Sequence, residues 1–169
     1  MGAVVSFLLA ADRPEMFAGI VCLSPAFASR YRPAFSDAFD IFAHLLYDTN
    51  KQFKLPFDSA MCTRDAEYRK KMDGDRREYR TVPARLLLEI LRMQFAAKNL
   101  GNDFRVPALF LVSGEDKIAD PAAAEAIFSA LKVKDKTFME FPEMYHSLSI
   151  EVGKESVFEE ILKWVERRI

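Results

Sequence analysis

The stretch VPALFLVSGEDKIAD, residues 106–120, begins as an unbroken apolar run and ends as a charged loop. Such a run, closed by turn residues, is typical of a strand that is buried on both faces of a parallel sheet. Two other runs have the same form: Phe17–Leu23, closed by Ser24-Pro25, and Lys136–Phe141, closed by Pro142. The sequence therefore predicts three parallel strands.

Helical patterns alternate with these strands. Val4–Ala11 is apolar nearly all round, which predicts a helix that is buried rather than amphipathic and that ends before Pro14. Pro121 stands at a favoured first-turn position for a helix over Ala122–Leu131, and Ser156–Arg168 predicts another. The order helix, strand, long insert, strand, helix, strand, helix indicates a parallel α/β domain.

The long insert spans residues 26–102 and separates the first two strands. Its pattern predicts helices around Asp37–Tyr47 and Pro83–Asn99. We therefore expect one domain with a core of residues 1–25 and 103–169, into which residues 26–102 are inserted as a helical unit.

Composition argues against several classes of protein. A formal net charge of −1 offers no electrostatic reason for a nucleic acid partner. Cys22 and Cys62 lack the paired spacing of a disulfide framework or a zinc site, and two histidines are too few for a histidine-rich metal site. No stretch reaches the roughly 18 apolar residues of a membrane span. We expect a cytoplasmic protein without metal, nucleic acid or transmembrane segment.

The opening MGAVVSFLLAADRPE permits three interpretations. As a secretory signal it lacks the positively charged start, and the charged residues from Asp12 to Glu15 follow at once. Residues 1–6 also match the loose pattern for myristoylation. The third interpretation, the interior of a folded domain, agrees with the buried helix predicted above.

Two polar loops, Ser113–Asp120 and Glu143–Leu148, directly follow predicted strands. Open α/β sheets bind their ligands at that edge, so a carboxylate of the first loop and the imidazole of His146 can meet there. An acid bonded to one ring nitrogen fixes the tautomer and leaves the other nitrogen as a base. The alternative is structural, because an Asp after a strand is often a cap, as Asp120 before Pro121 would be.

The block Leu109–Asp120 resembles the acid loop of α/β-hydrolases, particularly the monoacylglycerol lipase and lysophospholipase group. Phe141–His146 resembles the histidine loop of that family. The resemblance implies that Asp116 is the catalytic acid and His146 the catalytic base. The opening Met1-Gly2-Ala3 is similar to the residues that follow the nucleophile in the family motif G-x-S-M-G.

The resemblance covers essentially the whole chain but only the C-terminal part of the family's domain. It implies a nucleophilic serine immediately before Met1, at a position that this sequence does not contain, and the backbone N–H of Met1 as an oxyanion-hole donor. It also implies that residues 26–102 form the family's helical cap. Five aromatic residues of the insert could line a tunnel for an acyl chain, although core packing explains them as well: Phe35, Phe39, Phe42, Phe53 and Phe57.

The function implied is a serine ester hydrolase that acts on a lipid-like ester, needs no cofactor and contacts membranes peripherally through its cap. Two alternatives stay open: a non-catalytic fragment or truncated reading frame, and a hydrolase of amide, peptide or carbon–carbon bonds. Without its nucleophile, we expect the isolated chain to be inactive. Loss of the neighbouring strand would expose an apolar edge at Phe17–Leu23, which predicts self-association or a partner chain that covers this edge.

Overall fold

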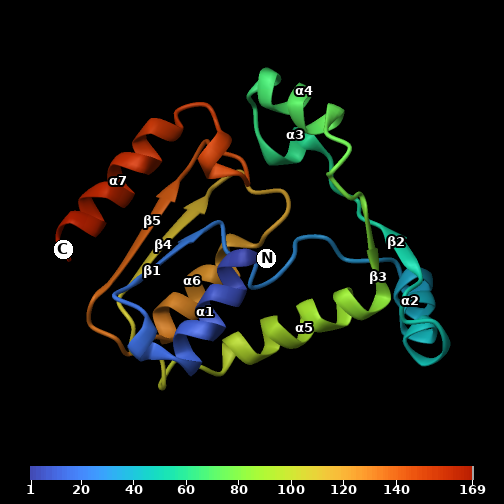
Figure 1. Cartoon of the computed structure of the whole chain (residues 1–169), viewed down its shortest axis with the longest axis horizontal. Helices are drawn as coiled ribbons and strands as arrows, with labels where there is room; N and C mark the ends of the chain where they lie inside the picture. Colours follow the sequence, from blue (N-terminus) through green and yellow to red (C-terminus); the bar gives the residue numbers. More distant parts are fainter. Residues whose placement is uncertain (169) are drawn as a thin grey trace.

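The computed structural model describes residues 1–168 and contains a three-stranded parallel sheet in the order β1-β4-β5 (Figure 1). The strands are β1 (Ile20–Leu23), β4 (Ala108–Ser113) and β5 (Lys136–Phe141). Every residue of β4 is buried, because this strand is hydrogen-bonded on both edges and covered on both faces. The three predicted parallel strands are confirmed.

Helices cover both faces of the sheet, because successive side chains of β4 point in opposite directions. Phe110 packs on one face with α1 (Gly2–Asp12) and α6 (Pro121–Ala130). Leu109 packs on the other face with α7 (Lys154–Glu166). Figure 1 shows α7 on the opposite side of the sheet from α1 and α6. The predicted α/β architecture is therefore confirmed.

Phenylalanines form the centre of the core between α1 and β4. Phe7 of α1 stacks on Phe104 with 4.5 Å between ring centroids and meets Phe27 edge to face at 5.2 Å. Phe110 of β4 stacks on Phe27 with 5.7 Å between ring centroids. All four side chains are buried, and burial of each contributes about 2–3 kcal/mol to stability.

Helix α1 forms where the apolar run predicted it, but it is not buried all round. Val4, Phe7 and Ala10 face the core, whereas Val5 and Leu9 are each 45% exposed. The helix covers one face of a sheet in which, within residues 1–168, β1 pairs with β4 alone. The prediction of complete burial was therefore wrong for the described chain, because nothing in residues 1–168 packs over the outer face of α1.

The insert, residues 26–102, leaves the sheet after β1 and returns to it at β4. It contains α2 (Phe35–Tyr47), β2 (Gln52–Lys54), α3 (Ser59–Cys62), α4 (Ala66–Gly74), β3 (Thr81–Pro83) and α5 (Ala84–Lys98). Strands β2 and β3 form a short antiparallel pair that periodicity had not predicted, since three residues are too few to show alternation. The helices predicted around 37–47 and 83–99 match α2 and α5.

The insert touches the core at two separate places. Helix α5 packs along α1, while the segment of α3 and α4 contacts the loop after β5, where Ser147 N donates to Cys62 O, and it lies to the right of α7 in Figure 1. Two single turns complete the fold: η1 (Pro14–Met16) before β1 and η2 (Leu148–Ile150) before α7. The second contact brings the insert next to the polar loops at the carboxyl edge of the sheet.

Candidate active site

Asp116 lies in the loop after β4 and is buried, with 1% of its surface exposed. One carboxylate oxygen, Oδ1, accepts hydrogen bonds from the backbone amides of Ile118 and Ala119, both at 2.8 Å. The other oxygen, Oδ2, lies 2.8 Å from Nδ1 of His146. Because two amides hold the carboxylate, it presents one oxygen to the imidazole in a fixed direction.

His146 lies in the loop after β5, and its side chain is 22% exposed. A carboxylate only accepts hydrogen bonds, so Nδ1 of His146 donates to Asp116. In the neutral imidazole the free lone pair is then on Nε2, for which the described residues offer no hydrogen-bond partner. The structure thus brings together the two residues that the sequence analysis singled out, with the base nitrogen directed away from the acid.

A close approach of the two loops makes this contact possible. Gly114 N donates to Phe141 O at 2.9 Å, and a Cβ atom at Gly114 would lie only 2.4 Å from the carbonyl oxygen of Pro142. A side chain at Gly114 would push the two loops apart. The glycine is therefore needed here for packing, independently of its backbone angles.

Two buried hydroxyls hold the backbone just before His146. Ser113 Oγ donates to the carbonyl oxygen of Tyr145 at 2.8 Å, and Ser24 Oγ lies 2.9 Å from Ser113 Oγ. Since the Ser113 proton points to Tyr145, Ser24 is the donor of the second bond. This relay joins the ends of β1, β4 and β5, and it leaves Ser24 buried and occupied rather than available as a nucleophile.

Glu151 is a buried acid beside the histidine loop that the sequence pattern did not predict. The side chain of Glu151 is fully buried and accepts hydrogen bonds from the amides of Tyr145, Arg64 and Val152. Burial raises the pKa of this carboxyl, but the three amides and the Arg64 guanidinium outweigh it and lower the pKa below its usual value. The signal available in the sequence was an isolated charge between the apolar residues Ile150 and Val152.

The profile of the hydrolase family described as serine aminopeptidase, S33, matches residues 1–153. The chain belongs to this family. It is an α/β-hydrolase of the monoacylglycerol lipase-like kind, and the resemblance found in the motifs is confirmed.

Curated relatives and solved structures agree with the family assignment. Human monoglyceride lipase is 29% identical over 177 residues, and the mouse monoglyceride lipase is 27% identical over 182 residues. The alignments cover 99% and 100% of this chain but 56% and 57% of the relatives. The chain therefore spans a little more than half the length of the curated relatives that it matches.

The fold superposes on the crystal structure of the Paleococcus ferrophilus monoacylglycerol lipase with a TM-score of 0.90 and 25% identity. This match covers 99% of the chain and 65% of that structure. A soluble variant of the monoglyceride lipase from Saccharomyces cerevisiae shares the fold, with a TM-score of 0.82, 18% identity, and coverage of 99% and 62%.

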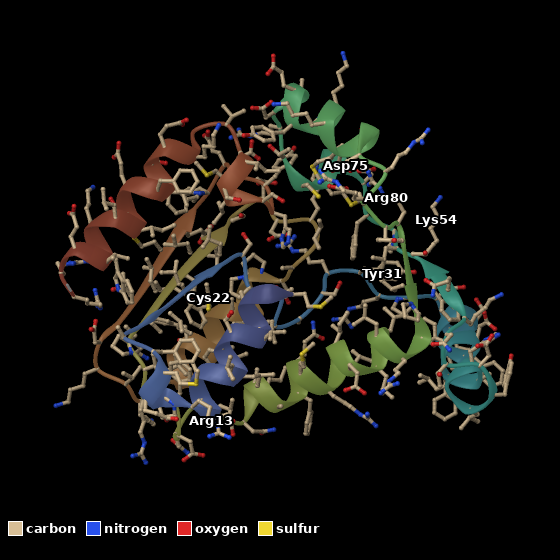
Figure 2. All side chains as sticks on the ribbon, viewed as in Figure 1. Arg13, Cys22, Tyr31, Lys54, Asp75 and Arg80 are labelled. Carbon is tan, nitrogen blue, oxygen red and sulfur yellow. The ribbon has the colours of Figure 1, made fainter. Side chains whose placement is uncertain are left out.

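The amino end of α1 lies at the same edge of the sheet as Asp116 and His146. Cys22, near the carboxyl end of β1 and labelled in Figure 2, has its sulfur 3.9 Å from the carbonyl oxygen of Ala3. Met1 is half exposed at that end, and burial lowers the pKa of its amine. The backbone nitrogen of Met1, the expected oxyanion-hole donor, lies at the start of α1.

The structure does not gather the five phenylalanines of the insert around Asp116 and His146. Phe35, Phe39 and Phe42 are exposed along α2, with 88%, 65% and 61% of their surface open. Phe53 and Phe57 are half-buried against His44 and Tyr31. Among the described residues, the side chains packed beside Asp116 come from the end of β4, the loops after β1 and β4, and the start of α6, and none of the five phenylalanines is among them.

Within residues 1–168, no cluster of three or more histidine, cysteine or acidic side chains is arranged to hold a metal ion. In the same range, no helix has the length and apolar character needed to cross a membrane.

Proposed function

We propose that this chain carries the acid and the base of a serine ester hydrolase, with Asp116 as the acid and His146 as the base. The observation that carries the proposal is the 2.8 Å contact between the buried Asp116 carboxylate and Nδ1 of His146. The contact lies at the carboxyl edge of a parallel sheet, where α/β folds assemble their catalytic groups.

The chemistry follows from this geometry. Asp116 holds the imidazole in the tautomer whose Nε2 is unprotonated and stabilises the positive charge that forms when Nε2 takes a proton. Nε2 of His146 would remove the proton from a serine hydroxyl as the hydroxyl attacks an ester carbonyl. The resulting imidazolium would then donate that proton to the departing alcohol.

We place the nucleophilic serine immediately before Met1, in a polypeptide longer than the sequence printed here. The contact between Cys22 and Ala3 supports this placement, since it holds the start of α1 at the edge occupied by Asp116 and His146. In such a polypeptide the nitrogen of Met1 is an amide, and its N–H would stabilise the oxyanion that forms on the carbonyl.

We further propose that the substrate is a lipid-like ester such as a monoacylglycerol, and that the insert acts as a cap. The names of the relatives, monoglyceride and monoacylglycerol lipases, support the substrate class. The exposed aromatic side chains of α2, Phe35, Phe39 and Phe42, suit contact with acyl chains or with a lipid surface.

Hydrolysis of an amide or peptide bond is the second candidate. It is favoured by one observation, the description of the matching family as serine aminopeptidase. The acid and the base would play the same parts, because ester and amide hydrolysis pass through similar tetrahedral intermediates. A non-catalytic role of the 169-residue chain by itself remains compatible with the absence of a G-x-S-x-G motif in its sequence.

One experiment separates these candidates. The in-frame coding sequence upstream of Met1 is included in expression, and the product is assayed with a monoacylglycerol and with an aminoacyl p-nitroanilide. Ester turnover that disappears in His146→Ala supports the proposal, and turnover of the anilide alone favours the peptidase. Turnover of a short p-nitrophenyl ester by the 169-residue chain, lost in His146→Ala, would overturn the placement of the nucleophile.

A further inference from the structure

Glu151 joins the insert to the loop that carries His146. Its Oε2 accepts from Tyr145 N at 3.0 Å, one residue before the histidine. Its Oε1 accepts from Arg64 N, also at 3.0 Å, and lies 3.3 Å from Thr63 Oγ1. The carboxylate therefore bridges the histidine loop to the insert segment at Thr63 and Arg64, and Arg64 lies 87 positions from Glu151 in the chain.

The backbone on the other side of His146 is held by the same segment of the insert. Ser147 N donates to the carbonyl oxygen of Cys62 at 2.8 Å. The residues before and after the histidine are thus both bonded to the insert, one through Glu151 and one directly. A displacement of the Cys62–Arg64 segment would therefore reach His146 from both sides.

Burial makes this bridge sensitive to substitution. The Glu151 side chain is fully buried, and the nearest counter-charge is the Arg64 guanidinium, with Nε 3.5 Å from Oε1. Removal of the acceptor would leave several backbone donors without a partner inside the protein, which costs about 1–3 kcal/mol for each buried donor. The backbone of the histidine loop would then move toward new partners.

We propose that Glu151 is a positioning residue that holds His146 in line with Asp116 and couples this alignment to the insert. Glu151 contacts neither of the two directly; it acts through Tyr145 and the backbone. The inference rests on the proposed function in one respect, namely that His146 serves as the catalytic base.

The test follows the imidazole itself, because the chain contains only two histidines. Long-range ¹H–¹⁵N spectra of the full chain with labelled histidine give one set of ring signals for each of the two histidines, which His44→Gln assigns. His44 lies in α2 with Nδ1 2.8 Å from Asp40 O, remote from Glu151 in the chain, and provides an internal reference. The Nδ1–H signal of His146 reports its bond to Asp116 directly.

Three variants probe the bridge. Glu151→Ala removes all acceptors, Glu151→Gln keeps one oxygen but turns an amide toward backbone donors, and Thr63→Val removes a hydroxyl on the insert side while conserving size. Ser59→Ala is the matched control, since it removes a partly buried hydrogen bond to Asp73 that lies wholly within the insert. Thermal unfolding of each variant shows that the chain still folds.

We expect the Nδ1–H signal of His146 to be lost to solvent exchange in Glu151→Ala, and to be retained but shifted in Glu151→Gln and Thr63→Val. His44 should not change in any of these variants, and Ser59→Ala should match the wild type in both signals. In the longer polypeptide with the serine, Glu151→Gln should lower kcat by up to about 100-fold with KM little changed.

Variants that unfold at lower temperature yet keep the wild-type signal of His146 would overturn the inference and leave Glu151 as a purely structural residue. If Glu151→Ala does not fold, an unchanged Nδ1–H signal of His146 in Thr63→Val and Glu151→Gln would overturn the inference. The two proposals can also fail separately. If substitution of Glu151 changes the Nδ1–H signal of His146 but the serine-containing polypeptide shows no turnover that depends on His146, the proposed function is rejected and the positioning role is kept.

Discussion

The carboxylate of Asp116 and Nδ1 of His146 lie 2.8 Å apart, although thirty positions separate these residues in the chain. Helix α6 and strand β5 occupy the interval and return the chain to the same edge of the sheet. The pair is held by backbone groups on the acid side and by Ser113 and Glu151 on the histidine side.

Asp116→Asn should disturb the tautomer of His146. The asparagine oxygen can still accept from the amides of Ile118 and Ala119, but its NH₂ group then faces Nδ1. Nδ1 becomes the acceptor, and the proton moves to Nε2. Histidine ¹⁵N shifts should show this reversal in the isolated chain, and the serine-containing polypeptide should lose about 10⁴-fold in kcat. Asp120→Asn, at the cap of α6, is the control and should leave the tautomer unchanged.

Gly114→Ala should destabilise the chain because its Cβ would lie 2.4 Å from Pro142 O. The two loops must separate, and we expect the free energy of unfolding to fall by about 1–3 kcal/mol in urea titrations. Gly74→Ala is the matched control, since a Cβ there meets nothing within 4 Å. Equal effects of the two substitutions would contradict the proposed close packing of the loops.

The stability of the chain should depend on pH through Glu151. Its pKa is lowered in the folded state, so the unfolded chain binds more protons between the lowered value and the ordinary value of 4.5. The free energy of unfolding contributed by this group is therefore complete above pH 4.5 and is lost as the pH falls through the folded-state pKa. Urea titrations from pH 6 to pH 3 should show a steeper loss for wild type than for Glu151→Gln. Glu155→Gln, an exposed glutamate of α7, should keep the wild-type slope.

Substitution of the aromatic face of α2 should reduce binding to lipid without unfolding the chain. Phe39 and Phe42 are mostly exposed, so the double variant Phe39→Ser and Phe42→Ser should change the thermal midpoint little. Co-sedimentation with phosphatidylcholine vesicles should fall markedly. Tyr79→Ser removes another exposed aromatic of the insert, and an equal loss in that control would argue against a specific role of α2.

The isolated chain should self-associate through the apolar face of α1 and the edge of β1. Val5 and Leu9 are each 45% exposed, and β1 has one neighbouring strand within residues 1–168. Light scattering should show oligomers that decrease in the double variant Val5→Ser and Leu9→Ser. Val152→Ser, at another exposed apolar residue, should not have this effect. A clean monomer of the wild type at high concentration would refute the prediction.

The sequence by itself determined the three strands of the parallel sheet, most helices and the identity of the polar residues at the sheet edge. A strand that is buried on both faces needs a continuous apolar run, and the consecutive residues of β4 form such a run. The places of Asp116 and His146 directly after two such runs were visible for the same reason. The pairing of β2 with β3 was not visible in the sequence, because strands of three residues are too short to show an alternating pattern.

Only the tertiary structure decided which polar groups meet. The contact of Gly114 with Pro142, the relay from Ser24 to Tyr145 and the bridge of Glu151 to Arg64 each join residues that are far apart in sequence. A buried carboxylate becomes favourable only when the folded chain supplies donors around it, and no local periodicity encodes those donors. Apolar burial is therefore readable from neighbours in the chain, whereas the hydrogen bonds that align His146 depend on neighbours in space.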